Sequence, residues 1–200
     1  MKMILFFAVA MAFVAVAFAQ NGYKVGDVAA DFELKNIDGK MVSLADFEDA
    51  QGFIVVFTCN HCPYAKAYED RLVELDKMYA AKGYPVIAIN PNDAKKYSED
   101  SYEMMKTRAE EKGFTFPYLV DGDSKVAATY GATRTPHTYL LQKKEDKLTV
   151  AYIGAIDDNY RNADEVEESF LANAVNNLLA GKKVEKNYTR AIGCTIKWVQ

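Results

Sequence analysis

Two cysteines three positions apart are the residues of this chain best suited to chemistry. Cys59 and Cys62 follow an apolar run at 53–57 and precede the stretch 63–82, whose apolar residues recur with a helical period before Gly83. A cysteine at the start of a helix meets unpaired backbone N–H groups and a partial positive charge, which both stabilise a thiolate. Because the thiolate is the reactive form of cysteine, the spacing and the flanking elements predict a redox-active dithiol.

The two cysteines are expected to have different roles. Cys59 is predicted to lie exposed at the helix start, with a lowered pKa, and to attack a substrate disulfide. Cys62, one turn further, is predicted to be more buried and to release the product as the resolving thiol. A structural disulfide and a metal-binding pair are the alternatives for a Cys-x-x-Cys taken by itself.

The elements that must position this dithiol alternate between strands and helices, which predicts a mixed sheet with helices on both faces. An Asp-Gly turn at 38–39 joins a predicted hairpin near the N-terminus. Runs without polar alternation, at 53–57 and 85–89, are typical of central strands buried on both faces. The other predicted elements are a strand at 116–120, a hairpin of 138–141 with 148–153, and helices at about 99–112, 124–130 and 164–180.

The N-terminal residues have the pattern of a secretory signal peptide. Lys2 precedes an apolar run at 3–18, and Ala17-Phe18-Ala19 is a small-x-small cleavage site. An uncleaved membrane anchor is the alternative, but the run is short for a span of roughly 20 residues. We expect cleavage after Ala19, a secreted or periplasmic protein without stable membrane insertion, a domain at 20–180 and a C-terminal tail at 181–200 that docks on it.

The charge of the chain narrows the choice of partners. Its formal net charge is −4, and its lysines and arginines are scattered along the sequence. Nucleic-acid binders normally present a basic face, and anionic membranes attract basic clusters, so neither partner is expected. The expected partners are protein or small-molecule disulfides and thiols, together with a redox partner protein. No cofactor and no metal are expected.

A third cysteine is left over near the C-terminus. Three cysteines are an odd number, and too few for a disulfide scaffold in a chain of this size. Cys194 therefore has three interpretations: a buried free thiol, a third redox partner or an intermolecular disulfide. The apolar residues around it favour a tail that packs against the domain.

Four stretches together resemble a known family: 25–34, 38–44, Phe57-Thr58-Cys59-Asn60-His61-Cys62-Pro63 and Thr133-Arg134-Thr135-Pro136-His137-Thr138. In their order and spacing, the chain is similar over about residues 23–180 to thioredoxin-fold redoxins of the AhpC/TSA, peroxiredoxin-like group. Ala30 stands where that group usually has a proline. The resemblance implies an α/β, thioredoxin-like three-layer fold, in which a central mixed sheet is flanked by helices and carries an N-terminal β-hairpin extension.

The resemblance also implies roles for the residues of the loop at 133–138. Pro136 is expected to follow a cis peptide bond beside the dithiol, so that Thr135 can pair with an extended substrate segment by strand-like hydrogen bonds. An ordinary trans proline is the alternative. Arg134 resembles by position the arginine that peroxiredoxins place near their reactive thiolate, although a solvent-facing arginine fits the sequence as well.

Both histidines of the chain fall in the predicted site. His61 is expected to stabilise the Cys59 thiolate, as in strongly oxidising periplasmic thiol oxidants, unless it only faces solvent. His137 is a candidate proton acceptor for the buried thiol, or else an outward-facing strand residue. A proton acceptor matters because the wholly apolar run at 53–57 lacks the buried acid that thioredoxins carry there.

Three functions remain open at this point. An exported thiol–disulfide oxidoreductase is the first, and His61 predicts a reduction potential above the roughly −270 mV of thioredoxin. The second is a peroxidase, which needs a proline seven positions and a threonine or serine three positions before its reactive cysteine. The positions seven and three before Cys62 hold Val55 and Cys59, and those before Cys59 hold Gly52 and Val56. Neither cysteine therefore has the proline and the hydroxyl residue that a peroxidase needs. The third is a copper or zinc carrier using Cys59, Cys62 and His137, which lacks a fourth donor. The direction of electron flow is not fixed by the sequence.

Overall fold

The computed structural model describes residues 22–200. The predicted signal peptide at 1–19 lies outside the described residues. Two sheets are formed. The larger sheet has eight strands in the order β1-β9-β8-β4-β5-β6-β2-β3, and the smaller consists of β10 and β7. The strands are β1 (Val28–Ala29), β2 (Glu33–Asn36), β3 (Met41–Ser43), β4 (Gly52–Phe57), β5 (Val86–Asn90), β6 (Tyr118–Val120), β7 (Arg134–Thr135), β8 (His137–Lys144), β9 (Lys147–Gly154) and β10 (Cys194–Thr195).

Four α-helices accompany these strands. They are α1 (Pro63–Tyr79), α2 (Tyr102–Lys112), α3 (Lys125–Tyr130) and α4 (Phe170–Leu179). Between residues 22 and 200, no helix is long and apolar enough to cross a membrane.

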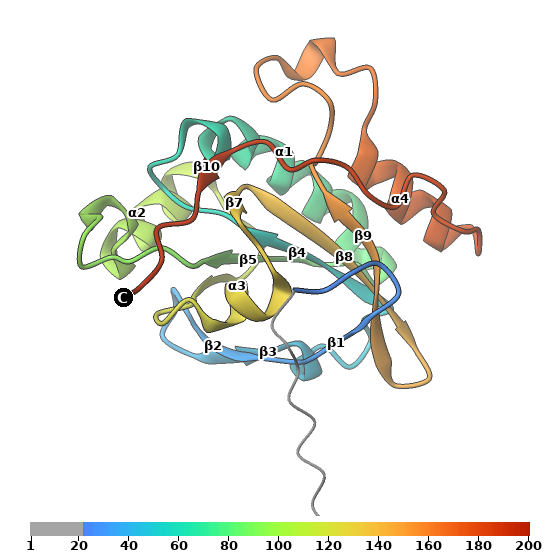
Figure 1. The fold of residues 1–200 in the computed structure, drawn as a ribbon, viewed down its shortest axis with the longest axis horizontal. Helices are drawn as coiled ribbons and strands as arrows, with labels where there is room; N and C mark the ends of the chain where they lie inside the picture. The colour runs from blue at the N-terminus through green and yellow to red at the C-terminus, as the bar shows by residue number, and fades with distance from the viewer. Residues whose placement is uncertain (1–21) are drawn as a thin grey trace, which may run out of the picture.

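The central strands β4 and β5 pair in parallel, and β8 joins β4 antiparallel. Every residue of β4 and β5 is buried, as expected for strands covered on both faces. One apolar core lies between the sheet and helices α1, α2 and α4. A second core lies on the other face, beneath α3 and the N-terminal segment. Figure 1 shows the resulting layers, which confirm the predicted thioredoxin-like three-layer fold.

The predicted N-terminal hairpin is confirmed as β2 and β3. They pair antiparallel around the turn at 38–39, and Gly39 has a φ of 90°, a conformation that glycine adopts without a steric penalty. The hairpin extends the large sheet, because β2 also pairs with β6.

Two helices begin later than the sequence pattern predicts. A short 3-10 turn at Ser98–Asp100 precedes α2, and Ser101 is extended before the helix begins at Tyr102. A similar turn at Ala163–Glu165 precedes α4, which starts at Phe170 instead of about 164. At the first of these turns the side chain of Asp100 is buried, so this residue faces the interior of the protein instead of capping an exposed helix end.

Candidate active site

The dithiol lies between the end of β4 and the start of α1. Cys62 occupies the N-cap position of α1 without a side-chain capping bond, and Pro63 occupies the first helical position, where no backbone N–H is needed. Cys59 and Cys62 are free thiols with exposed fractions of 2% and 0%. The expectation that Cys59 is exposed is therefore wrong for this structure, because other segments pack over the dithiol.

One of these segments is the loop that contains Thr135 and Pro136. Their peptide bond is cis, as predicted, and Thr135 is fully buried. The Cys59 sulfur lies 3.2 Å from the Thr135 hydroxyl oxygen. The Cys62 thiol donates a hydrogen bond of 3.2 Å to the Thr135 carbonyl oxygen. A single residue of this loop therefore contacts both sulfurs.

The two thiols shift each other's pKa in opposite directions. Their mutual hydrogen bond lowers the pKa of Cys62, helped by hydrogen bonds from Cys194 and from the backbone N–H of Ala65. The same hydrogen bond, followed by burial and the nearby Asp100 carboxylate, raises the pKa of Cys59. The predicted lowering at Cys59 is thus wrong for this arrangement. The two thiols therefore lose their protons in two separate steps, and the first loss leaves one negative charge on the pair.

A buried carboxylate lies on the other side of the motif. The Asp100 side chain is fully buried, and its Oδ2 lies 2.5 Å from Nδ1 of His61. Its Oδ1 accepts the backbone N–H of Asn60 at 2.7 Å, and Asn92 donates to Oδ2 at 2.8 Å. These bonds fix the two residues between the cysteines. His61 also stacks on Tyr97, with ring centroids 5.5 Å apart.

Sequence reasoning missed Asp100. The prediction that the chain lacks a buried acid considered only the strand before the motif, where thioredoxins carry theirs. Here the acid comes from the turn before α2, 41 positions after Cys59. Glu99 and Asp100 look alike in sequence, as polar residues before a helix, yet Glu99 is exposed and Asp100 is buried. No local signal separates them.

The ligand atoms of Cys59, His61 and Asp100 all lie within 4.8 Å of one another. Such a set has donor types that bind zinc, but a structural zinc site needs a fourth ligand. His137, which the carrier hypothesis included, is not part of this set.

The remaining predicted residues support the loop at 133–137. His137 is buried, so its outward-facing alternative is wrong, and its Nδ1 accepts the Thr133 backbone N–H at 3.3 Å. Burial lowers the pKa of His137 to about 4, which keeps the imidazole neutral at pH 7. Arg134 donates to the backbone carbonyl of Gly193 at 3.3 Å, so it binds the C-terminal tail.

The third cysteine lies at the same site. Cys194 is half-buried and packs against the cluster of Cys59, Cys62 and Ala65. It pairs across β10 and β7 with Thr135. The structure therefore gathers all three cysteines of the sequence around one loop.

Residues 25–150 match the AhpC/TSA family, which is more than half of the chain. The chain belongs to the AhpC/TSA family. Among curated relatives, it is 29% identical over 119 residues to the thiol-disulfide oxidoreductase ResA of Geobacillus thermodenitrificans, covering 60% of this chain and 64% of ResA. It thus spans less than two thirds of that relative. It is 32% identical over 125 residues to the thioredoxin-like protein YneN of Bacillus subtilis, covering 62% and 68%.

Solved structures share the fold of this chain. A conserved protein from Geobacillus kaustophilus, titled as uncharacterized, superposes with a TM-score of 0.82 at 39% identity and covers 90% of this chain and 94% of its own. Thioredoxin-family and thiol:disulfide interchange structures superpose with TM-scores of 0.54 to 0.59 at 18% to 22% identity. At that identity they show the shared thioredoxin-like fold alone.

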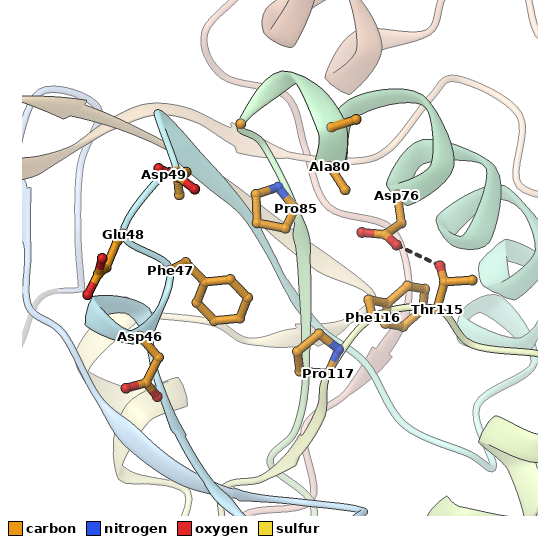
Figure 2. Close-up of a pocket in the computed structure, with 13 residues that line it drawn as sticks. Asp46, Phe47, Glu48, Asp49, Asp76, Ala80, Pro85, Thr115, Phe116 and Pro117 are labelled. Atoms are coloured by element: carbon orange, nitrogen blue, oxygen red, sulfur yellow. Dashed lines mark hydrogen bonds between the residues drawn. The ribbon is translucent and has the colours of Figure 1, made fainter.

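A large cavity of this AhpC/TSA protein lies away from the dithiol. Its volume is about 740 Å³, and its lining includes Asp46, Glu48, Asp49 and Pro85 (Figure 2). Pro85 immediately precedes β5, so the cavity lies at the opposite end of the parallel strands from Cys59. The Asp76 carboxylate in its wall is already bonded to the Thr115 hydroxyl and the Val86 N–H. No cysteine lines this cavity, so we place the chemistry at the other end of the sheet.

Proposed function

We propose that this protein is an exported thiol–disulfide oxidoreductase that exchanges disulfides through Cys59 and Cys62. The observation that carries the proposal is the contact of both sulfurs with Thr135, 3.2 Å to its hydroxyl and 3.2 Å to its carbonyl. The similarity to ResA, named a thiol-disulfide oxidoreductase, supports it. Export rests on the pattern of residues 1–19.

The reaction begins with the dithiol. The lowered pKa of Cys62 and the raised pKa of Cys59 place the resting negative charge on the Cys62 sulfur, while the Cys59 thiol keeps its proton. Cys59 becomes the attacking thiolate when this proton passes to Cys62, against the difference in pKa. The Thr135 hydroxyl is in place to donate to that thiolate, while the protonated Cys62 donates to the Thr135 carbonyl. We assign the attack to Cys59 because it precedes the helix and is 2% exposed as a residue, whereas Cys62 is 0% exposed.

Attack of the Cys59 thiolate on a substrate disulfide forms a mixed disulfide and releases one substrate thiolate, which takes up a proton. Cys62 then loses its proton and attacks the Cys59 sulfur. This step forms the Cys59–Cys62 disulfide and releases the second substrate thiolate, which takes up the proton that Cys62 lost. Two electrons pass from the dithiol to the substrate, and the reverse sequence oxidises a substrate dithiol.

Reduction of insulin by dithiothreitol tests the proposal. We expect Cys59→Ser to lower the catalysed rate by about 1,000-fold or more, because the attacking thiolate is lost. Cys62→Ser should instead accumulate a mixed disulfide between Cys59 and substrate, visible by intact-protein mass spectrometry. Equal rates for wild type and Cys59→Ser would refute the assignment.

The reduction potential tests the direction of electron flow. Equilibration of the Cys59–Cys62 pair with glutathione should give a value above roughly −270 mV, the potential of thioredoxin, because a His61 that stabilises the Cys59 thiolate stabilises the reduced form. A value at or below that of thioredoxin would remove the tuning role of His61.

A peroxidase is the second candidate within the AhpC/TSA family. The positions where its proline and threonine would be needed hold Gly52, Val55 and Val56, which are buried residues of β4. They offer no side-chain hydroxyl to a peroxide. We therefore expect hydrogen peroxide consumption with dithiothreitol to stay at the level of the Cys59→Ser variant.

A further inference from the structure

The C-terminal tail returns to the dithiol along a defined path. The backbone N–H of Thr189 donates to the Ile153 carbonyl, and β10 then pairs antiparallel with β7, so that Cys194 lies opposite Thr135. Figure 1 shows this segment, in red, passing beside β7. Because Thr135 contacts both reactive sulfurs, the tail is paired with the residue at the centre of the site.

A glycine makes this close approach possible. A Cβ at Gly193 would lie 2.2 Å from the Thr135 carbonyl oxygen and 2.7 Å from its carbonyl carbon. Both atoms are backbone, which cannot move aside as a flexible side chain can. A residue without a side chain therefore stands where the tail touches the cis-proline loop.

The tail is held on both sides of the contact. Before it, Arg134 donates to the Gly193 carbonyl. After it, the Ile196 N–H donates to the Thr133 carbonyl at 3.2 Å, and the Ile196 side chain is 4% exposed within the second core. The Lys197 backbone then accepts the Asp93 N–H with its carbonyl and donates its own N–H to the side-chain Oδ1 of Asn92. These contacts hold Cys194 against the dithiol.

The edge of β7 that the tail occupies is the edge where an extended substrate would pair. The tail carries to that edge a half-buried thiol that packs against Cys59, Cys62 and Ala65. The proximity of Cys194 and Cys62 lowers the pKa of the Cys62 thiol, and burial together with Cys62 raises that of Cys194. The segment 193–196 is therefore similar to a bound substrate strand: it is extended, it pairs with Thr135, and it carries a cysteine beside the dithiol.

We propose that Cys194 is a third redox cysteine, presented by the tail as an internal substrate strand, and that it exchanges disulfides with Cys62. The proposal rests on the proposed oxidoreductase function and extends it. Starting from the Cys59–Cys62 disulfide, the Cys194 thiolate attacks the Cys62 sulfur. The Cys62–Cys194 bond forms, the Cys59–Cys62 bond breaks, and its electron pair leaves on Cys59.

The exchange needs no external oxidant, because one disulfide replaces another. The proton that Cys194 gives up neutralises the Cys59 thiolate or passes to solvent. The product has Cys59 reduced again, while the oxidising equivalents reside on Cys62 and Cys194. An external substrate strand must displace the tail to reach Thr135, so the same segment competes with substrate.

Peptide mapping tests the proposal directly. Trypsin places Cys59 and Cys62 on the peptide 41–66 and Cys194 on the peptide 191–197, so a link between them is diagnostic. Cys59→Ser and Cys62→Ser form a matched pair, each leaving one dithiol sulfur to react with Cys194. After oxidation with diamide and blocking of free thiols, we expect about tenfold more linked peptide from Cys59→Ser than from Cys62→Ser.

Wild-type protein provides a test that needs no variant. Its oxidised form should contain the 41–66 to 191–197 link within one chain, with Cys59 recovered as the blocked thiol. Absence of the link from both wild type and Cys59→Ser, equal links in the two variants, or links only between different chains would overturn the proposal. Circular dichroism and thermal melting establish that both variants are folded.

The two proposals fail in different ways. If wild type reduces insulin but forms no Cys62–Cys194 link, the internal exchange is wrong and the proposed function stands. If the link forms but wild type does not reduce insulin, the proposed function is wrong and the exchange between Cys62 and Cys194 stands.

Discussion

The dithiol has two flanks that differ in kind. On one flank, Asp100 bonds to His61, Asn60 and Asn92 within a buried polar network. On the other, the tail covers the sulfurs through β10, a strand of two residues, and the half-buried Cys194. We call these the polar flank and the tail flank.

The comparison indicates a division of labour. Buried hydrogen bonds to a charged group are strong and costly to break, so the polar flank is suited to fixing the geometry and electrostatics of the motif. The tail flank depends on a short strand pairing at the edge of a two-stranded sheet, which is suited to local opening. The polar flank is thus suited to setting the pKa of the sulfurs, and the tail flank to controlling the access of substrate to them.

The largest effect we expect is a loss of protein stability at acidic pH, caused by His137, which follows the loop that the tail pairs with. Burial lowers the pKa of His137 to about 4, below the value of about 6.5 in an unfolded chain. Between these values the unfolded state binds more protons, so stability falls as pH decreases. The expected loss by pH 4 is about 3 kcal/mol of unfolding free energy.

Urea unfolding of wild type and His137→Asn across pH 7 to 4 measures this loss. Carboxylates titrate in both proteins, so the difference between the two curves isolates His137. We expect the variant to be less stable at pH 7 and the gap to close as the pH falls. Parallel curves would mean that His137 does not lose a proton on folding.

The next largest effect belongs to the polar flank. Asp100→Asn preserves the shape of the side chain but removes a negative charge that raises the pKa of Cys59. We expect the pH midpoint of Cys59 alkylation by iodoacetamide to fall by about one unit. At a pH below both midpoints, this makes the alkylation rate of the variant about tenfold higher than that of wild type. Fragmentation of the peptide 41–66 distinguishes Cys59 from Cys62.

Glu99→Gln is the matched control for Asp100→Asn. It removes the same charge from the adjacent position, where the carboxylate is exposed and only the backbone carbonyl bonds to Asn60. The control should leave the profile unchanged. Identical shifts in the two variants would show that general electrostatics act here, and that the buried position of Asp100 has no special role.

The same comparison shows what sequence could and could not predict. The dithiol, its place between β4 and α1, and the N-terminal hairpin are encoded by neighbouring residues, and each was predicted. The cis bond before Pro136 followed from the family resemblance. These features depend on local pattern or on motifs with fixed spacing.

The two flanks depend on contacts between distant parts of the chain, and sequence pattern does not encode those. Asp100 contacts His61, which lies 39 positions before it in the sequence, and Cys194 pairs with Thr135, which lies 59 positions before it. The expected exposure of Cys59 is wrong for the same reason, because it considers only the helix start and not the segments that pack over it. The expected lowering of the Cys59 pKa is wrong chiefly because of the hydrogen bond with the neighbouring Cys62, with burial and Asp100 adding to it.

The smallest effect we predict separates coverage by the tail from tuning by the polar network. Gly193→Ala places a methyl group against the Thr135 backbone, so β10 must move away from β7. We expect the dithiol to be alkylated about fivefold faster, because local opening of a covering segment exposes the sulfurs. The pH midpoint of Cys59 alkylation should stay closer to the wild-type value than in Asp100→Asn, since the contacts of Asp100 with Asn60 and His61 are intact.

Gly122→Ala is the control, because its added Cβ would meet only Val120 Cγ1 at 3.9 Å, an ordinary contact. It should match wild type in both rate and midpoint. If the alkylation rate of Gly193→Ala rises only because its pH midpoint shifts, the division between the flanks is contradicted. The tail would then act on the proton equilibrium of the sulfurs instead of on their exposure. An unchanged rate would place the control of access elsewhere, since a tail that moves without exposing the thiols does not cover them.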